Sequence, residues 1–252
     1  MKLLLSNDDG VMAAGIDFLN VELMQEFDTT VIAPDQERSS CGHGITLGDP
    51  IRVKEIKKDI YQCSGYPADC ILVGIGNILL ENKPDLVVSG INHGANLGQD
   101  RYYSGTIAAA REAAFRGVPS IAVSLATKNL KDIQHFETAA KFVRKIISKG
   151  ILKHIPQDCL ININVPNLPE GKIVGVKLAS SGFQQYSEEV IERTDARGRN
   201  YYWVGGTYQG SKDIPGSDCN IVNEGHISVE LQNLTGDGIK DLSSLEEFLN
   251  DL

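Results

Sequence analysis

The sequence alternates short apolar runs with segments of helical periodicity over its first two thirds, and this pattern constrains the fold more than any other feature. The apolar runs are typical of buried strands and lie at Lys2–Leu5, Thr29–Ala33, Asp85–Ser89, Pro119–Ser124 and Leu160–Val165. Between them, apolar spacing predicts helices over the segments Ile16–Phe27, Ala68–Leu80, Ile107–Arg116 and Phe136–Ile147. Strands separated by helices predict an α/β fold, with a Rossmann-like, mainly parallel sheet and helices on both faces.

The character of the chain changes after Pro166. The segments Lys172–Leu178, Glu188–Thr194, Asn200–Val204 and His226–Leu231 are typical of strands with few helices between them. Arg197-Gly198-Arg199 is a candidate hairpin turn, and Leu242–Leu252 is expected to form a short terminal helix. We therefore expect an α/β core over residues 1–166 and a β-rich appendage over residues 167–252. The appendage could pair with another subunit or form a self-contained hairpin, and the sequence favours neither.

Composition excludes several classes of protein. The chain has 252 residues, of which 42% are hydrophobic and 23% charged, as is ordinary for a globular protein. A net charge of −9 argues against nonspecific binding to nucleic-acid polymers or anionic membranes. No apolar run approaches the ~20 residues of a membrane span, and the first run is shorter than a signal peptide requires. The 5 cysteines are scattered without a CxxC pair, so we expect free thiols and a cytoplasmic location.

Polar loops follow several of the predicted strands. Asp8 and Asp9 follow the first strand, Ser39 lies in the loop after the second, and Asn92 follows the third. Ligands of open α/β sheets bind just beyond the carboxyl ends of the strands, so these loops are expected to converge. Their donors are oxygen atoms, which suit Mg²⁺ or Mn²⁺, with Ca²⁺ as an alternative, rather than zinc. The alternative for Asp8-Asp9-Gly10 is a solvated turn, for which Asp-Gly is common.

Two further segments have the composition of an anion site. The glycines of Gly90–Gly98 are spaced four apart, unlike a dinucleotide fingerprint or a P-loop, and would let backbone amides approach a ligand. Ser104-Gly105-Thr106 is expected to begin a helix, where free amides and the helix dipole favour an anion. A loop that only needs positive φ, and a helix cap without a ligand, remain the alternatives. His43 and His93 are expected to be exposed, although His43 is a weak candidate for a general acid.

Several motifs, in the right order along nearly the whole chain, resemble the SurE family of stationary-phase survival nucleotidases. They include Leu4–Gly10, Ala33-Pro34-Asp35 with Ser39, Pro67–Cys70, Ser89–Asn92 through Gly98, Tyr103–Thr106, Asn162–Pro166 and Arg197–Arg199 with Tyr201-Tyr202-Trp203. The sequence departs from the family pattern at Ser40, Cys41, Tyr66 and Ala196. None of these departures removes a proposed ligand; they affect loop shape and base selectivity.

The resemblance implies a metal-dependent 5′-nucleotidase, a phosphoric monoester hydrolase that acts on nucleoside monophosphates. It implies one divalent ion per subunit, and the ligand positions here are Asp8, Asp9, Ser39 and Asn92, with the two aspartates as catalytic residues. It places the phosphate near Asn96 and near Ser104, Gly105 and Thr106. It also implies a homodimer or homotetramer formed through the C-terminal segments.

We hypothesise that the ion neutralises a phosphate oxygen and activates the attacking water. An aspartyl-phosphate route is disfavoured, because the side chains of the contiguous Asp8 and Asp9 should point in different directions. A broader phosphatase that also acts on 3′-nucleotides and short polyphosphate would share every residue named. A non-catalytic nucleotide-binding module remains a third hypothesis. A nicotinamide dehydrogenase is disfavoured by the missing dinucleotide fingerprint.

Overall fold

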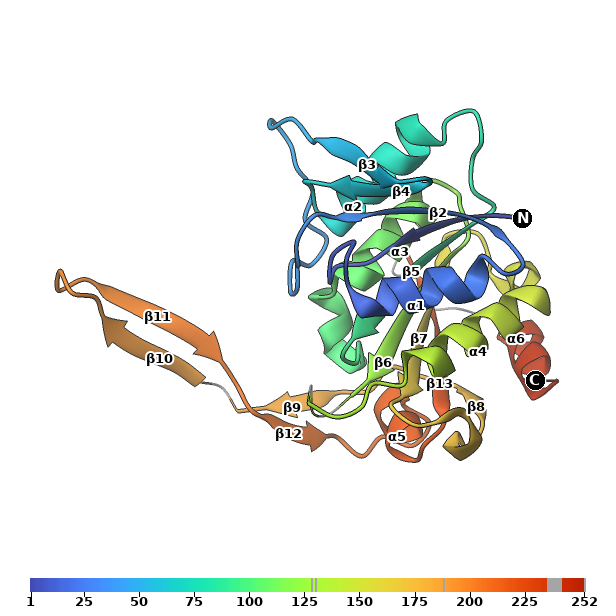
Figure 1. The fold of residues 1–252 in the computed structure, drawn as a ribbon. Helices are drawn as coiled ribbons and strands as arrows, with labels where there is room; N and C mark the ends of the chain where they lie inside the picture. The colour runs from blue at the N-terminus through green and yellow to red at the C-terminus, as the bar shows by residue number, and fades with distance from the viewer. Residues whose placement is uncertain (128, 130, 188, 235–241, 252) are drawn as a thin grey trace.

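The computed structural model describes residues 1–127, 129, 131–187, 189–234 and 242–251. Its centre is a 9-stranded sheet with the order β3-β4-β2-β1-β5-β6-β7-β13-β8 (Figure 1). The strands of this sheet are β1 (Lys2–Ser6), β2 (Asp28–Pro34), β3 (Val53–Lys57), β4 (Ile60–Cys63), β5 (Leu86–His93), β6 (Ser120–Ala126), β7 (Cys159–Pro166), β8 (Val176–Leu178) and β13 (Ile227–Asn233). Neighbours from β4 through β7 pair in parallel, whereas β3 and β13 run antiparallel to β4 and β7. The predicted mainly parallel α/β sheet is confirmed.

Helices cover both faces of the sheet. On one face lie α1 (Ala14–Leu23), α4 (Phe136–Ser148) and α6 (Ser243–Asn250); on the other lie α2 (Pro67–Val73) and α3 (Gly105–Phe115). The alternation of strand side chains explains this division. In β1, Leu3 and Leu5 pack in the core of the first face and Leu4 in the core of the second. A strand buried on both sides is expected to be a nearly continuous apolar run, as this one is.

Most predicted elements of residues 1–166 are present at the expected places. The expected Ala68–Leu80 helix is α-helical only to Val73 and continues as a π-helical turn over Gly74–Ile78. The hairpin of β3 and β4 was not expected, because β3 is almost wholly exposed and three of its five residues are charged. Two 3-10 turns, η2 (Gly98–Tyr102) and η3 (Ile151–His154), complete this part of the chain.

The segment after Pro166 has two different parts. Strands β8 and β13 and helix α6 belong to the core, because β13 pairs with β7 and buries Ile227, Val229 and Leu231. The prediction that all of 167–252 forms an appendage is wrong in this respect. Lys172–Leu178 was expected as one strand, but only β8 is a strand, after the 3-10 turn η4 (Glu170–Lys172). The short helix α5 (Asp218–Asn223) precedes β13.

The projecting part is an arm built from two antiparallel pairs (Figure 1). At its base, β9 (Gln184–Tyr186) pairs with β12 (Tyr208–Ser211), and further out β10 (Glu189–Thr194) pairs with β11 (Asn200–Gly205). The expected turn at Arg197-Gly198-Arg199 is confirmed: Asp195 accepts from the Gly198 amide, and Gly198 has a φ of 80°. Of the expected β and helical segments, Glu188 and Leu252 lie outside the described residues. No helix among the described residues is long and apolar enough to cross a membrane.

Candidate functional site

The predicted site residues meet in one cavity at the carboxyl ends of β1 and β5. The cavity has a volume of about 420 Å³ and is lined by Asp8, Asp9, Ser39, Ser40, Asn92, His93, Gly94, Ala95, Asn96, Asp100, Tyr103, Ser104 and Tyr186. All four predicted metal ligands are in this lining, together with Asn96 and Ser104 from the predicted phosphate site. Gly105 and Thr106 lie directly behind it, in contact with Asp8. The loops therefore converge as the strand order predicts.

Asp8 is almost completely buried, with 4% of its surface exposed, so the solvated-turn alternative is wrong for this residue. The Asn7 side chain fixes the turn by bonding both the amide and the carbonyl of Gly10 at 3.2 and 2.9 Å. The Thr106 hydroxyl donates a hydrogen bond to Asp8 Oδ1. Burial raises the pKa of Asp8 to about 6, and the charge of Asp9 acts in the same direction, whereas hydrogen bonds from Thr106 lower it.

Asp9 lines the same cavity as Asp8, but its side chain has a different hydrogen-bond partner. Its Oδ2 accepts a hydrogen bond of 3.0 Å from the backbone amide of His93. Burial raises its pKa, and the neighbouring Glu37 carboxylate adds to that effect. No lysine or arginine in the described part of the chain forms an ion pair with Asp8 or Asp9. Two desolvated carboxylates thus lie together without a cationic side chain.

Asn92 and Ser39 bring neutral oxygen atoms to the same cavity. Asn92 Nδ2 donates to the Gly94 carbonyl at 2.9 Å, and its Oδ1 lies 3.3 Å from the Thr106 hydroxyl. The amide is therefore oriented with its oxygen toward the Asp8 side. Ser39 Oγ is exposed and donates to Glu37 at 2.7 Å, which leaves its oxygen lone pairs for a ligand.

The donor set fits a hard divalent cation. The described residues contain no cluster of three His, Cys, Asp or Glu side chains that could hold a metal ion. A cation in this cavity would therefore use Ser39 and Asn92 oxygens beside the two carboxylates. Such mixed oxygen ligation suits Mg²⁺, Mn²⁺ or Ca²⁺, and zinc would prefer nitrogen or sulfur. A cation would stabilise the charged forms of Asp8 and Asp9, because it relieves the repulsion between two desolvated carboxylates.

The beginning of α3 forms one wall of the site. Ser104 caps the helix by accepting from the Ile107 amide at 3.1 Å, so this segment begins a helix as predicted. Gly105 packs so closely that an added Cβ would lie 2.8 Å from both Asp8 Cβ and Cys41 Sγ. Thr106 donates hydrogen bonds to Asp8 from its hydroxyl and its backbone amide. The helix N-terminus thus directs its first-turn donors toward the buried carboxylate.

Asn96 lines the cavity but is tied firmly into the sheet. Its Nδ2 donates to Ser124 at 2.7 Å, and its backbone amide donates to Asn164 at 2.8 Å. The side chains of Asn162 and Asn164 both donate to its carbonyl oxygen. This polar network holds the loop after β5 against β6 and β7.

The two candidate histidines differ from their expected exposure. His43 is partly buried, lies outside the cavity lining and has Nε2 3.0 Å from a Glu112 carboxylate oxygen. His93 lines the cavity, and its ring meets Phe136 edge-on at 5.8 Å. Its Nε2 is buried without a hydrogen-bond partner in the described structure. The expectation that His43 is an exposed loop residue, and that His93 faces solvent, is wrong.

Asp100 and Tyr186 were not predicted from the sequence, yet both line the cavity. Tyr186 reaches it from β9 at the base of the arm and donates a hydrogen bond from its hydroxyl to Asp100. No local motif marks Tyr186, because 86 residues separate it from Asp100. Only the docking of the arm against η2 brings the two together.

Known proteins with similar sequences belong to one family. The profile of the family described as Survival protein SurE matches residues 3–188. The chain belongs to the SurE family. A protein of Geotalea daltonii named 5′-nucleotidase SurE is 44% identical over 229 residues, which are 91% of each chain. Another of that name from Geobacter sulfurreducens is 42% identical over 248 residues, covering 98% of this chain and 94% of the relative.

A solved SurE structure shares the whole fold. The crystal structure of the SurE protein from Aquifex aeolicus superimposes with a TM-score of 0.83 at 37% sequence identity, and the match covers 98% of this chain and 99% of that one. The match extends beyond the SurE profile, which ends at residue 188, and so includes the arm and the strands that return to the sheet. The resemblance inferred from the motifs is confirmed.

Proposed function

We propose that this SurE protein is a metal-dependent 5′-nucleotidase that hydrolyses nucleoside 5′-monophosphates to nucleoside and phosphate. The observation that carries the proposal is the gathering of Asp8, Asp9, Ser39 and Asn92 in one cavity beside the N-terminus of α3. Relatives that share 42–44% of their residues with it carry the name 5′-nucleotidase. Asp8 and Asp9 are the proposed catalytic residues as well as ligands.

The proposed ion is Mg²⁺ or Mn²⁺, with one ion per subunit held by these four side chains. When bound, it would neutralise a phosphate oxygen and lower the pKa of the attacking water. The two carboxylates support this proposal, because at an effective dielectric near 20 two like charges 4 Å apart repel by about 4 kcal/mol. A bound cation would attract both carboxylates and so offset their mutual repulsion.

The protein residues have separate tasks in the proposal. Thr106 holds the Asp8 carboxylate in one orientation, and Gly105 lets the helix approach it. Ser104 and Asn96 line the cavity where the phosphate would lie, and the positive end of the 11-residue helix α3 favours its negative charge. Preorganised donors of this kind stabilise charge on phosphoryl oxygens without reorganisation. His43 is paired with Glu112 and does not line the cavity, so we assign it no catalytic task.

We further propose that the protein is a homodimer or homotetramer formed through its C-terminal arm. Val190, Trp203 and Val204 of the outer hairpin are 65%, 65% and 85% exposed. These exposed apolar side chains on a projecting ribbon support the proposal, because exposed apolar patches often serve as interaction sites. A cytoplasmic location is also proposed, supported by the free thiols of Cys41, Cys63, Cys70, Cys159 and Cys219.

Phosphate release decides between the proposal and its alternatives. The purified protein is assayed on 5′-AMP, 3′-AMP and tripolyphosphate, with Mg²⁺ or Mn²⁺ and with a chelator. The proposal predicts metal-dependent release that is fastest on 5′-AMP. Comparable rates on all three substrates would indicate the broader phosphatase. Nucleotide binding without any phosphate release would indicate a non-catalytic module. Undiminished phosphate release in chelator would contradict the proposed metal dependence.

A further inference from the structure

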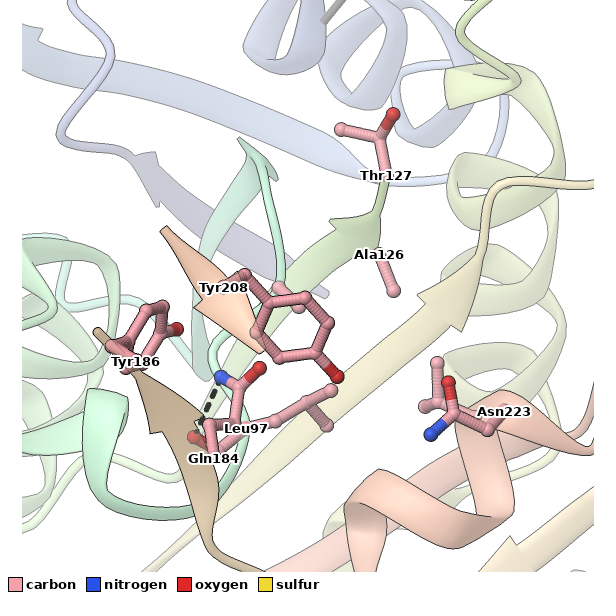
Figure 2. Close-up of a pocket in the computed structure, with 9 residues that line it drawn as sticks. Leu97, Ala126, Thr127, Gln184, Tyr186, Tyr208 and Asn223 are labelled. Atoms are coloured by element: carbon pink, nitrogen blue, oxygen red, sulfur yellow. Dashed lines mark hydrogen bonds between the residues drawn. The ribbon is translucent and has the colours of Figure 1, made fainter. Parts of the chain in front are cut away.

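A second cavity, shown in Figure 2, shares part of its lining with the cavity of Asp8 and Asp9. It has a volume of about 180 Å³ and is lined by Ala95, Leu97, Ala126, Thr127, Gln184, Tyr186, Tyr208, Val222 and Asn223. Ala95 and Tyr186 line both cavities. Complete small-molecule sites usually measure ~300–1,000 Å³, so the smaller cavity has the size of a subsite for part of a ligand.

Tyr186 and Tyr208 give this second cavity an aromatic wall. They face each other directly across the β9–β12 pair, with ring centroids 5.8 Å apart and planes inclined by 60°. Figure 2 shows the Tyr208 ring between Tyr186 and the helix that carries Asn223. Tyr208 is 43% exposed and Tyr186 42% exposed, so both rings are accessible to a ligand.

The aromatic wall is held in place by the loop that lines the cavity of Asp8 and Asp9. The Gln99 side chain makes two hydrogen bonds with the Gln184 backbone: its Nε2 donates to the Gln184 carbonyl at 2.7 Å, and its Oε1 accepts from the Gln184 amide at 2.8 Å. Gln184 Nε2 also donates to the Leu97 carbonyl at 3.3 Å. With the bond from Tyr186 to Asp100, these contacts fix β9 against η2. The position of the tyrosines is thus set relative to Asp8 and Asp9.

The chemistry of this wall matches a nucleobase. An aromatic ring binds the flat face of any base by stacking, and such stacking tolerates different bases. The exposed amide of Asn223 on the same cavity offers a donor and an acceptor to the edge of a base. A phosphate gains little from contact with an aromatic surface. The neighbouring cavity has the charged and polar groups that would suit a phosphate.

We infer that the second cavity binds the nucleobase of a nucleotide whose phosphate lies in the cavity of Asp8 and Asp9, and that Tyr208 stacks on the base. This inference rests on the proposed function, because it assigns a place to the rest of the same substrate. It makes Tyr208 a residue that determines preference for nucleotides over simpler phosphate esters. Tyr186, shared by both cavities, lies at the position of the sugar that joins base and phosphate.

The test compares two substrates that differ only in the base. We measure kcat/KM for 5′-AMP and for ribose 5-phosphate in wild type, Tyr208→Ala, Tyr208→Phe and a control, Tyr202→Ala. Tyr202 is an exposed tyrosine of β11 in the outer hairpin and lines neither cavity. In Tyr208→Ala the ratio of the two kcat/KM values should fall about 5- to 100-fold, the usual loss when a stacked aromatic is truncated. Tyr208→Phe should restore the ratio, and Tyr202→Ala should leave it at the wild-type value.

Binding measured by calorimetry in the presence of Mg²⁺ keeps the test independent of turnover. Wild type should bind 5′-AMP more tightly than ribose 5-phosphate, and Tyr208→Ala should remove that difference. If no substrate is turned over but this difference is present, the proposed function fails and the base site stands. If Tyr208→Ala leaves both the kinetic ratio and the binding difference unchanged while its thermal stability matches wild type, the inference is overturned.

Discussion

Gly105 lies in direct contact with Asp8: a Cβ added to Gly105 would stand 2.8 Å from the Asp8 Cβ and 2.9 Å from its Oδ2. Gly105 is the first residue of α3 and does not have a positive φ, so an alanine there would suit the backbone. The requirement for glycine at this position is therefore steric. The helix must approach the carboxylate closely for its donors to reach it.

The first prediction is that Gly105→Ala lowers activity strongly without unfolding the protein. The methyl group would displace Asp8 from the Thr106 hydroxyl, and a displaced ligand costs about 100-fold in rate. The matched control is Gly76→Ala, since nothing lies within 4 Å of a Cβ added there. Phosphate release and thermal unfolding are measured for both. Wild-type kcat/KM in Gly105→Ala would contradict the role given to this contact.

The second prediction concerns Thr106, which donates to Asp8 and lies near Asn92. Thr106→Val keeps the shape of the side chain and removes the hydroxyl. We expect weaker Mn²⁺ binding and about 10- to 100-fold lower kcat, because a buried carboxylate loses one of its donors. Thr106→Ser should recover most of both. Mn²⁺ affinity measured by calorimetry would separate this positioning role from phosphate binding, since a residue that only contacts phosphate would leave metal affinity unchanged.

The third prediction is a pH dependence of stability in the metal-free protein. The pKa of Asp8 rises from its ordinary value of 3.8 to about 6 on folding. An acid with a raised pKa in the folded state binds its proton more tightly when folded, so protonation stabilises the fold. Stability should therefore increase as pH falls from 7 towards 4, by at most about 3 kcal/mol from this residue.

Chemical denaturation between pH 7.5 and 4.5 measures the effect, with Asp8→Asn as the control, because its amide does not titrate. The difference between wild type and Asp8→Asn should change with pH below 7 and level off near 4. Added Mn²⁺ should stabilise the wild type more at pH 7.5 than at pH 5, because the cation competes with the proton. A difference that stays constant over this range would contradict the burial of the Asp8 charge.

The fourth prediction concerns the outer hairpin. Trp203→Glu with Val204→Glu places charges on two of the most exposed apolar positions of the arm. Light scattering after size exclusion should show a dimer or tetramer for wild type and a smaller species for the variant. A variant at Arg197, in the turn of the same hairpin, provides a control that changes charge but not apolar surface. A monomeric wild type would rule out the proposed assembly.

The sheet could be predicted from the sequence because its buried strands have a local sequence pattern. Leu3, Leu4 and Leu5 are buried on both faces, and a continuous apolar run is the signature of such a strand. The β3–β4 hairpin was missed, because exposed strands with charged residues have no such signature. β13 was recognised as a strand, but its pairing with β7 depends on contacts between residues far apart in the sequence.

The candidate site followed from a rule of topology rather than from any single motif. Asp8, Asp9, Ser39 and Asn92 could be grouped because parallel strands end at one edge of the sheet. The contact between Thr106 and Asp8 spans 98 residues, and nothing in either segment specifies it. Tyr186 reaches the cavity only through the fold of the arm. Side-chain partners such as the Glu112 that pairs with His43 are likewise set by packing.

Phosphate release from 5′-AMP by Asp8→Asn tests the central claim most directly, with Asp49→Asn as a control for loss of an exposed carboxylate in a loop. We predict that wild type and Asp49→Asn release phosphate with Mg²⁺ or Mn²⁺ and stop in chelator. Asp8→Asn should remain folded and lose activity by at least about 100-fold, since it removes a charged ligand. Wild-type turnover by Asp8→Asn in excess metal would contradict the proposed metal site.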